Sequence, residues 1–229
     1  MKYLLEKEET KPFLLFCTSK KYRAHALNLV TELYKIKGDP AVIQTAAWYF
    51  DMLISQQRVT QCNLLLVITA CFWIAQKIHG NAYMAPKLIE LTGNHFNTAQ
   101  LFSMERKILC RLKFPPQPVV PQEFLGYLVS CCDSEQSKGT IFSCATFICV
   151  TSNNVNIDTC CVYPSVIAVA AVKTTLLLLK KYDLAQKLKE CFLYSAAFSK
   201  GEVIEVSISQ IHALKTFFAE DFKFTASKI

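Results

Sequence analysis

Apolar residues recur at intervals of three and four along most of this 229-residue chain, the spacing of a helix with one buried face. Sustained alternation of apolar and polar residues, the pattern of a strand, is hard to find. Glycine, which weakens helix interiors, occurs only six times. The sequence therefore predicts an all-α protein.

Two runs are apolar almost all round, which a solvent-facing helix does not tolerate. The first, 64–77, predicts a helix buried in a globular core, with Lys77 emerging at its C-terminal end. The second, 164–179, begins about 100 residues later, and each run lies near the middle of a set of helical patterns. This spacing predicts two similar domains, each of about five helices around one buried central helix.

Short local signals set the predicted helix boundaries. Asp39-Pro40 indicates a helix start, 86–93 a short helix, and Asn97 with Gln100 a reciprocal cap. The prolines that follow Phe114 cannot continue a helix. We predict an N-terminal helix and lead-in (1–19), a first domain (20–114), a linker (115–119), a second domain (120–220) and a tail (221–229).

Like Lys77, Glu105 is a charged residue in apolar surroundings, because helical spacing places it on an apolar stripe. That stripe consists of Leu101, Ile108, Leu109 and Leu112. A carboxylate there needs a cationic partner or hydrogen-bond donors, since an unpaired buried charge is costly. Lys77 and Glu105 therefore form either a structural ion pair or a charged pair that grips another protein's backbone at the edge of an apolar surface.

Composition narrows the classes of function. Apolar residues make up 52% and charged residues 19%, which indicates large buried helices or an apolar face covered by a partner. The net charge is +7, but lysines and arginines are scattered along the chain, so nucleic-acid binding is not favoured. No Walker loop, kinase signature, nucleophile elbow or metal motif occurs, so no enzyme activity and no cofactor are predicted.

The eleven cysteines do not form a disulfide or zinc pattern, because no Cys-x-x-Cys occurs. An odd number of free thiols is typical of a reducing intracellular compartment. No secretory signal is visible, and the apolar runs are too short or interrupted for a membrane span of roughly 20 residues. Five cysteines lie in apolar helical patterns and are predicted to be core residues: Cys62, Cys71, Cys110, Cys144 and Cys149.

Five segments resemble motifs of the cyclin family, in order and at cyclin-like spacing. They are Tyr22–Leu33 (the cyclin-box opening MRAILVDWLVEV), Phe50–Leu53 (IDRFL), Leu64–Lys77 (the stretch ending ASK), Ser103–Phe114 (RME…LxF) and Tyr163–Ala171 (LPSVIAGAA). Each motif alone is weak, but their common register makes a specific match. The resemblance extends from about Tyr3 to about Phe218 and implies tandem cyclin folds at 20–114 and 120–220.

The resemblance also implies roles for five residues. Lys77 and Glu105 match the lysine and glutamate that hydrogen-bond the kinase backbone near its movable helix and activation segment. Arg23 and Asp51 match a buried bidentate pair that ties the first helix to the second, and Leu66 matches a core position.

The resemblance also implies a substrate-docking patch, in degenerate form, made by residues of the cyclin-box opening together with Leu64 of the run 64–77. Glu32 and Leu64 keep the family's residue types. Four other positions depart from the usual Met, Ile, Leu and Trp, and they are occupied by Tyr22, His25, Ala26 and Leu29. We therefore expect weak binding of kinase substrates through this patch.

The resemblance implies a non-catalytic regulatory subunit that forms a 1:1 heterodimer with a cyclin-dependent kinase and activates it to drive cell-cycle progression. Glu6–Thr10 resembles the lead-in of D-type cyclins, and the short N-terminus resembles gammaherpesvirus cyclins. The expected location is the nucleus and cytoplasm, with no membrane and no nucleic-acid partner. The alternative is a tandem cyclin-fold adaptor of the transcription factor IIB type, which binds nucleic acid.

Overall fold

The computed structural model describes residues 1–8, 20–34, 39–56, 59–80, 84–130, 135–152, 162–193, 206–208 and 210–211. The regular secondary structure of these residues is helical, so the prediction of an all-α protein is confirmed. The helices are α1 (Lys2–Glu8), α2 (Lys20–Tyr34), α3 (Pro40–Gln56), α4 (Gln61–Ile78), α5 (Ala85–Leu91), α6 (Thr98–Arg111), α7 (Pro121–Ser130), α8 (Glu135–Ser152), α9 (Pro164–Leu178) and α10 (Tyr182–Leu193).

The chain divides into two compact units. The N-terminal unit, Thr10–Val120, contains α2–α6, and the C-terminal unit combines Met1–Glu9 with Pro121–Ile229 and contains α1 and α7–α10. Residues 115–119, the expected linker, are described and carry no helix. The expected tail, 221–229, lies outside the described residues. The assignment of a second cyclin fold to 120–220 stays a prediction.

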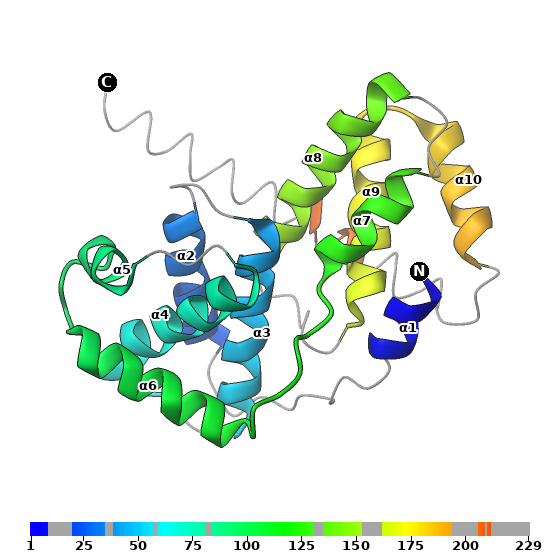
Figure 1. Ribbon diagram of the computed structural model, residues 1–229. Helices are drawn as coiled ribbons and strands as arrows, with labels where there is room; N and C mark the ends of the chain where they lie inside the picture. Colours follow the sequence, from blue (N-terminus) through cyan, green and yellow to red (C-terminus); the bar gives the residue numbers. More distant parts are fainter. Residues whose placement is uncertain are drawn as a thin grey trace, which may run out of the picture. The chain divides into compact units, whose positions relative to one another are not determined.

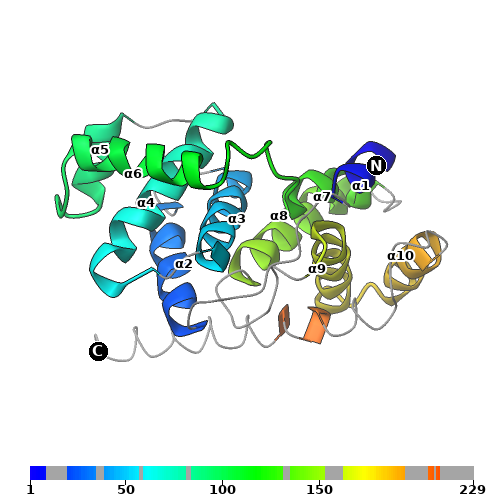
Figure 2. The ribbon, with the colours of Figure 1, turned by 90° about the horizontal axis from the view of Figure 1, so that it is seen from below.

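Helix α4 forms the centre of the N-terminal unit and packs against α2, α3 and α6 (Figures 1 and 2). Most of its side chains are buried, from Leu64 through Gln76, whereas Lys77 emerges in the last turn. This burial follows from the apolar composition of 64–77, because neighbouring helices can cover such a helix on several sides. The prediction of a buried helix with Lys77 emerging at its end is confirmed.

The C-terminal unit has the same plan around α9, which packs against α7, α8 and α10 (Figure 2). Twelve residues of α9, from Pro164 to Leu176, are buried, as expected from the apolar run 164–179. Pro164 stands in the first turn, where a proline costs no helical hydrogen bond.

Local capping fixes where the helices of the N-terminal unit begin. Asp39 Oδ1 accepts a hydrogen bond of 2.9 Å from the backbone N–H of Ala41 at the start of α3. At the start of α6, Asn97 Oδ1 accepts from the Gln100 N–H at 2.9 Å, while the Asn97 N–H donates to Gln100 Oε1 at 2.8 Å. Both caps were predicted from the sequence, and the second sets the register of the helix that carries Glu105.

Helix α4 meets the length and apolar composition of a membrane span, with 18 residues and a mean hydropathy of 1.4. The sequence had indicated that its apolar run was too short, but the helix starts three residues earlier, at Gln61. Within the unit 61% of this helix is buried, as in a core helix. Its length therefore gives only weak support for a membrane segment.

Candidate functional site

Lys77 and Glu105 meet between α4 and α6. Lys77 Nζ donates a hydrogen bond to Glu105 Oε1, and the two side chains form an ion pair. The Lys77 side chain is 42% exposed and that of Glu105 is 14% exposed. The pair thus lies at the edge of the core, with the lysine as its more accessible member.

Trp73 completes this cluster, although its role was not predicted from the sequence. Its indole Nε1–H donates to Glu105 Oε2 at 2.9 Å, and Lys77 Nζ lies 5.4 Å from its ring centroid. Trp73 precedes Lys77 by four residues, so both project from the same side of α4. One signal was present in the sequence: a buried indole N–H needs an acceptor, and the chain has only two tryptophans.

Phe102 adds an apolar surface beside the charged pair. It stands one turn before Glu105 on α6, and its ring stacks on Trp73 with 6.2 Å between centroids and 30° between planes. Phe102 is 45% exposed, whereas Trp73 is only 8% exposed. An accessible aromatic ring next to a hydrogen-bonding lysine combines apolar contact with polar specificity, which suits protein recognition.

Arg23 of α2 and Asp51 of α3 form a buried bidentate pair. Arg23 Nε donates to Asp51 Oδ1 at 2.7 Å, and Nη2 donates to Oδ2 at 2.9 Å. Both residues are largely removed from solvent. The parallel hydrogen bonds match the planar guanidinium to the carboxylate, so the pair fixes the position of α2 on α3. This is the arrangement that the family resemblance implied.

Leu66 is half-buried and does not belong to the core, contrary to the prediction. It lies seven residues before Trp73 and eleven before Lys77, which places it on their side of α4. The apolar run could not reveal this, because it is apolar on every side and only tertiary packing decides which side is covered. Leu66 extends the partly exposed surface along α4, about three turns before Lys77.

His79 is the C-terminal cap residue of α4, two positions after Lys77. Its Nε2 and the hydroxyl oxygen of Thr45 are 2.9 Å apart and share a hydrogen bond. This contact fixes the end of α4 against the beginning of α3. The imidazole of His79 is therefore held in place by Thr45 near Lys77.

The expected docking patch has little accessible apolar surface among its described members. Ala26 and Leu64 are buried, Leu29 is half-buried, and His25 and Glu32 are exposed on the same side of α2. The side chain of Tyr22 lies outside the described residues.

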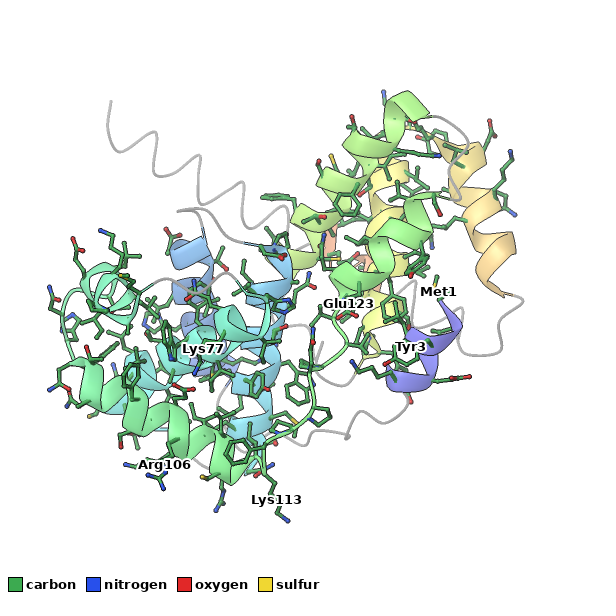
Figure 3. The ribbon with its side chains drawn as sticks, in the orientation of Figure 1. Met1, Tyr3, Lys77, Arg106, Lys113 and Glu123 are labelled. Carbon is green, nitrogen blue, oxygen red and sulfur yellow. The ribbon has the colours of Figure 1, made fainter. Side chains whose placement is uncertain are left out.

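The C-terminal half of α6 and the turn after it concentrate positive charge. Arg106 and Lys113 point outward from this helix in Figure 3. The exposed cationic side chains here are Arg106, Lys107, Arg111 and Lys113. The expectation that cations are scattered along the chain is therefore wrong for this end of α6.

The family described as "Cyclin, N-terminal domain" matches residues 1–115, which is half of the chain and includes the whole α4–α6 site. The chain belongs to the cyclin family. No curated protein sequence matches it.

Two solved structures show how far this cyclin shares its fold with others. A viral cyclin from herpesvirus saimiri matches with a TM-score of 0.77 and 19% identity, covering 93% of this chain and 96% of the other. A chain of the yeast RNA Pol II CTD kinase CTDK-1 complex matches with a TM-score of 0.63 and 15% identity, covering 93% and 71% respectively. The predicted likeness to a herpesvirus cyclin is confirmed at the level of the fold.

The described cysteines of this cyclin are free thiols, but they are not all core residues. Cys71 and Cys149 are buried, whereas Cys144 is half-buried and Cys62 and Cys110 are exposed. The exposed pair corrects the prediction, because both lie on the outer sides of their helices. Among the described residues, no group of three or more His, Cys, Asp or Glu side chains could hold a metal ion.

Alkylation should separate these thiols into two classes. Burial raises the pKa of both Cys71 and Cys149, so their reactive thiolate forms are suppressed as well as inaccessible. Brief treatment of the folded cyclin with N-ethylmaleimide at neutral pH should label Cys62 and Cys110 and leave Cys71 and Cys149 unmodified. Peptide mass spectrometry measures this. Equal labelling of Cys71 and Cys110 in the folded protein would contradict the burial of α4. Zinc bound in a stoichiometric amount, detected by native mass spectrometry, would contradict the prediction that the cysteines are free thiols.

Proposed function

We propose that this cyclin is a non-catalytic regulatory subunit that binds one cyclin-dependent kinase and activates it. Lys77 and Glu105 are the proposed kinase-contacting residues. Membership of the cyclin family supports a kinase partner, and the matching CTDK-1 chain comes from a kinase complex.

The observation that carries the proposal is the unequal exposure of the charged pair. Glu105 is largely covered and fixes the lysine, while 42% of the Lys77 side chain remains accessible. A lysine ammonium has three N–H donors, and the bond to Glu105 uses one of them. The others can donate to backbone carbonyl groups of a partner that packs on Phe102 and Leu66.

The mechanism we propose is a shift of population in the kinase. A kinase without its cyclin samples inactive arrangements of its movable helix and activation segment. The α4–α6 surface would bind the arrangement in which the kinase lysine, glutamate and magnesium-binding groups align. The required rigidity on the cyclin side comes from the packed helices and the Arg23–Asp51 pair.

A binding panel tests the partner class. The purified chain is immobilised and exposed to a set of purified cyclin-dependent kinases, with an unrelated protein kinase as the control. We expect stoichiometric capture of at least one cyclin-dependent kinase. Failure of every member to bind at micromolar concentration would contradict the proposal.

The alternative is a nucleic-acid adaptor, for which the cationic cluster of α6 is the favouring observation. A gel-shift titration with duplex DNA separates the two functions. Tight and salt-sensitive DNA binding that disappears when Arg106 and Lys107 are replaced by glutamine would favour the adaptor.

Docking of RxL peptides should be weak. The leucine of such a peptide needs an apolar floor, but Ala26 and Leu64 are buried and Leu29 is only half-exposed. Buried apolar surface contributes roughly 25 cal/mol per Å². The binding free energy of the peptide should therefore be about 1–3 kcal/mol weaker than for a cyclin that has a tryptophan in the patch. Fluorescence polarisation with a labelled RxL peptide measures the difference, and an affinity equal to that of a cellular cyclin would refute the prediction.

A further inference from the structure

The two carboxylate oxygens of Glu105 are held by two different residues of α4. Oε1 accepts from Lys77 and Oε2 accepts from the Trp73 indole N–H at 2.9 Å. Since the donors are four residues apart, they stand one above the other on the same side of the helix. The carboxylate is therefore fixed in orientation by α4 and not only by its own helix.

Trp73 acts on Lys77 as well, through the face of its ring. Lys77 Nζ lies 5.4 Å from the ring centroid, within the range of a cation–π interaction. Phe102 stacks on the indole at 6.2 Å and shields it. One side chain thus contacts the carboxylate through its edge and the ammonium through its face.

We propose that Trp73 is a positioning residue for kinase binding, which presets the Lys77–Glu105 pair before the partner arrives. The inference rests on the proposed function and adds a residue that does not need to touch the kinase itself. Lysine side chains carry several rotatable bonds, and fixing them on binding costs affinity. A pair already held by Trp73 loses less freedom when the complex forms.

A purely structural role for Trp73 would make a different prediction. A core tryptophan contributes apolar area and shape, and Trp73→Phe preserves most of both. The change removes the N–H donor to Glu105 and reduces the bicyclic indole to a phenyl ring, which still presents an aromatic face toward Lys77. A structural role therefore predicts a loss of stability alone, whereas a positioning role predicts weaker kinase binding in a protein that remains folded.

A double-mutant cycle tests this, with kinase affinity measured by calorimetry for Trp73→Phe, Glu105→Gln and the double variant. We expect Trp73→Phe to weaken binding roughly tenfold, the scale of a hydrogen bond to a charged group. In the Glu105→Gln background the same change should cost less than about threefold, because the two residues act as a unit. Trp48→Phe, at the other tryptophan, should leave the affinity unchanged.

The outcomes separate this proposal from the proposed function. The positioning role is wrong if Trp73→Phe weakens kinase binding by the same factor in both backgrounds. It is also wrong if Trp73→Phe leaves binding unchanged although Glu105→Gln weakens it. In both cases the kinase site stands. If Lys77→Ala and Glu105→Gln both bind normally, the site itself is misplaced and the positioning role is wrong with it.

A spectroscopic measurement keeps the proposal testable if Trp73→Phe does not fold. The chain is labelled with 5-fluorotryptophan, which gives one ¹⁹F signal for each of its two tryptophans, and Trp48→Phe assigns them. We expect the Trp73 signal, and not that of Trp48, to shift in Glu105→Gln and to shift on addition of unlabelled kinase. A Trp73 signal that is identical in all three samples would overturn the proposal.

Discussion

Replacing Lys77 or Glu105 by alanine is expected to weaken kinase binding by roughly 2–5 kcal/mol, the cost of truncating one member of a buried charged contact. In the complex the partner would cover the pair, so the surviving charge would be desolvated without its counter-charge. Affinity should be measured by calorimetry or surface plasmon resonance. Circular dichroism of each variant shows whether its helices are intact.

Two matched variants control for the change of charge. Lys107→Ala removes an exposed lysine of α6, and Glu90→Ala removes an exposed glutamate of α5. Neither should change kinase affinity by more than about 0.5 kcal/mol, as is usual for surface substitutions. A Lys77→Ala, Glu105→Ala double variant that is folded and binds as tightly as the controls would place the kinase interface elsewhere.

The largest expected effect on stability comes from the Arg23–Asp51 pair. Arg23→Ala or Asp51→Ala should lower the free energy of unfolding by about 3–5 kcal/mol, because each leaves an uncompensated buried charge. The two hydrogen bonds of 2.7 and 2.9 Å would be lost together. Urea unfolding followed by circular dichroism gives the difference directly.

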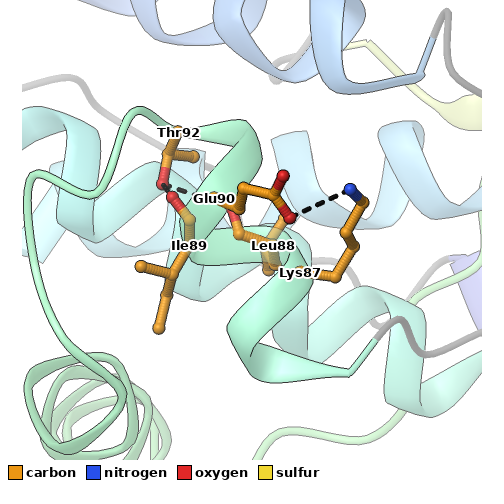
Figure 4. A network of polar contacts seen from close by, with 5 residues as sticks. All are labelled: Lys87, Leu88, Ile89, Glu90 and Thr92. Atoms are coloured by element: carbon orange, nitrogen blue, oxygen red, sulfur yellow. Dashed lines mark hydrogen bonds and ion pairs between the residues drawn. The ribbon is translucent and has the colours of Figure 1, made fainter.

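An exposed ion pair on α5 supplies the control for that experiment. Lys87 Nζ and Glu90 Oε2 are 2.9 Å apart, as close as the buried pair, but both side chains are more than half exposed (Figure 4). Lys87→Ala should therefore lower the free energy of unfolding by no more than about 0.5 kcal/mol, because the charges of an exposed pair are hydrated almost as well when they are apart. Equal losses for Lys87→Ala and Asp51→Ala would show that burial is not the cause.

The features that sequence predicted well are those determined by local chemistry. The cap of α6 needs only Asn97 and Gln100, three residues apart, and the central position of α4 follows from the mostly apolar run 64–77. The emergence of Lys77 at the end of that helix follows from the same pattern. Local signals also placed Glu105 on an apolar stripe, so its need for a partner was predictable.

The features that sequence missed depend on tertiary packing. The contact of Trp73 with Glu105 joins residues 32 positions apart, and no periodicity reports it. Leu66 and Cys110 have residue types typical of a core, but their sides of α4 and α6 are not fully covered. Helical spacing tells which residues share a side, and only the neighbouring helices decide whether that side is buried.

The most direct test of the central claim is the phosphorylation rate of a cyclin-dependent kinase that binds this chain. The kinase is assayed with a peptide substrate alone, with the wild-type chain, and with the Lys77→Ala, Glu105→Ala variant at the same concentration. The account predicts a large, saturable increase in rate with the wild-type chain and little increase with the variant. An unchanged rate with saturating wild-type chain, or equal activation by both proteins, would contradict it.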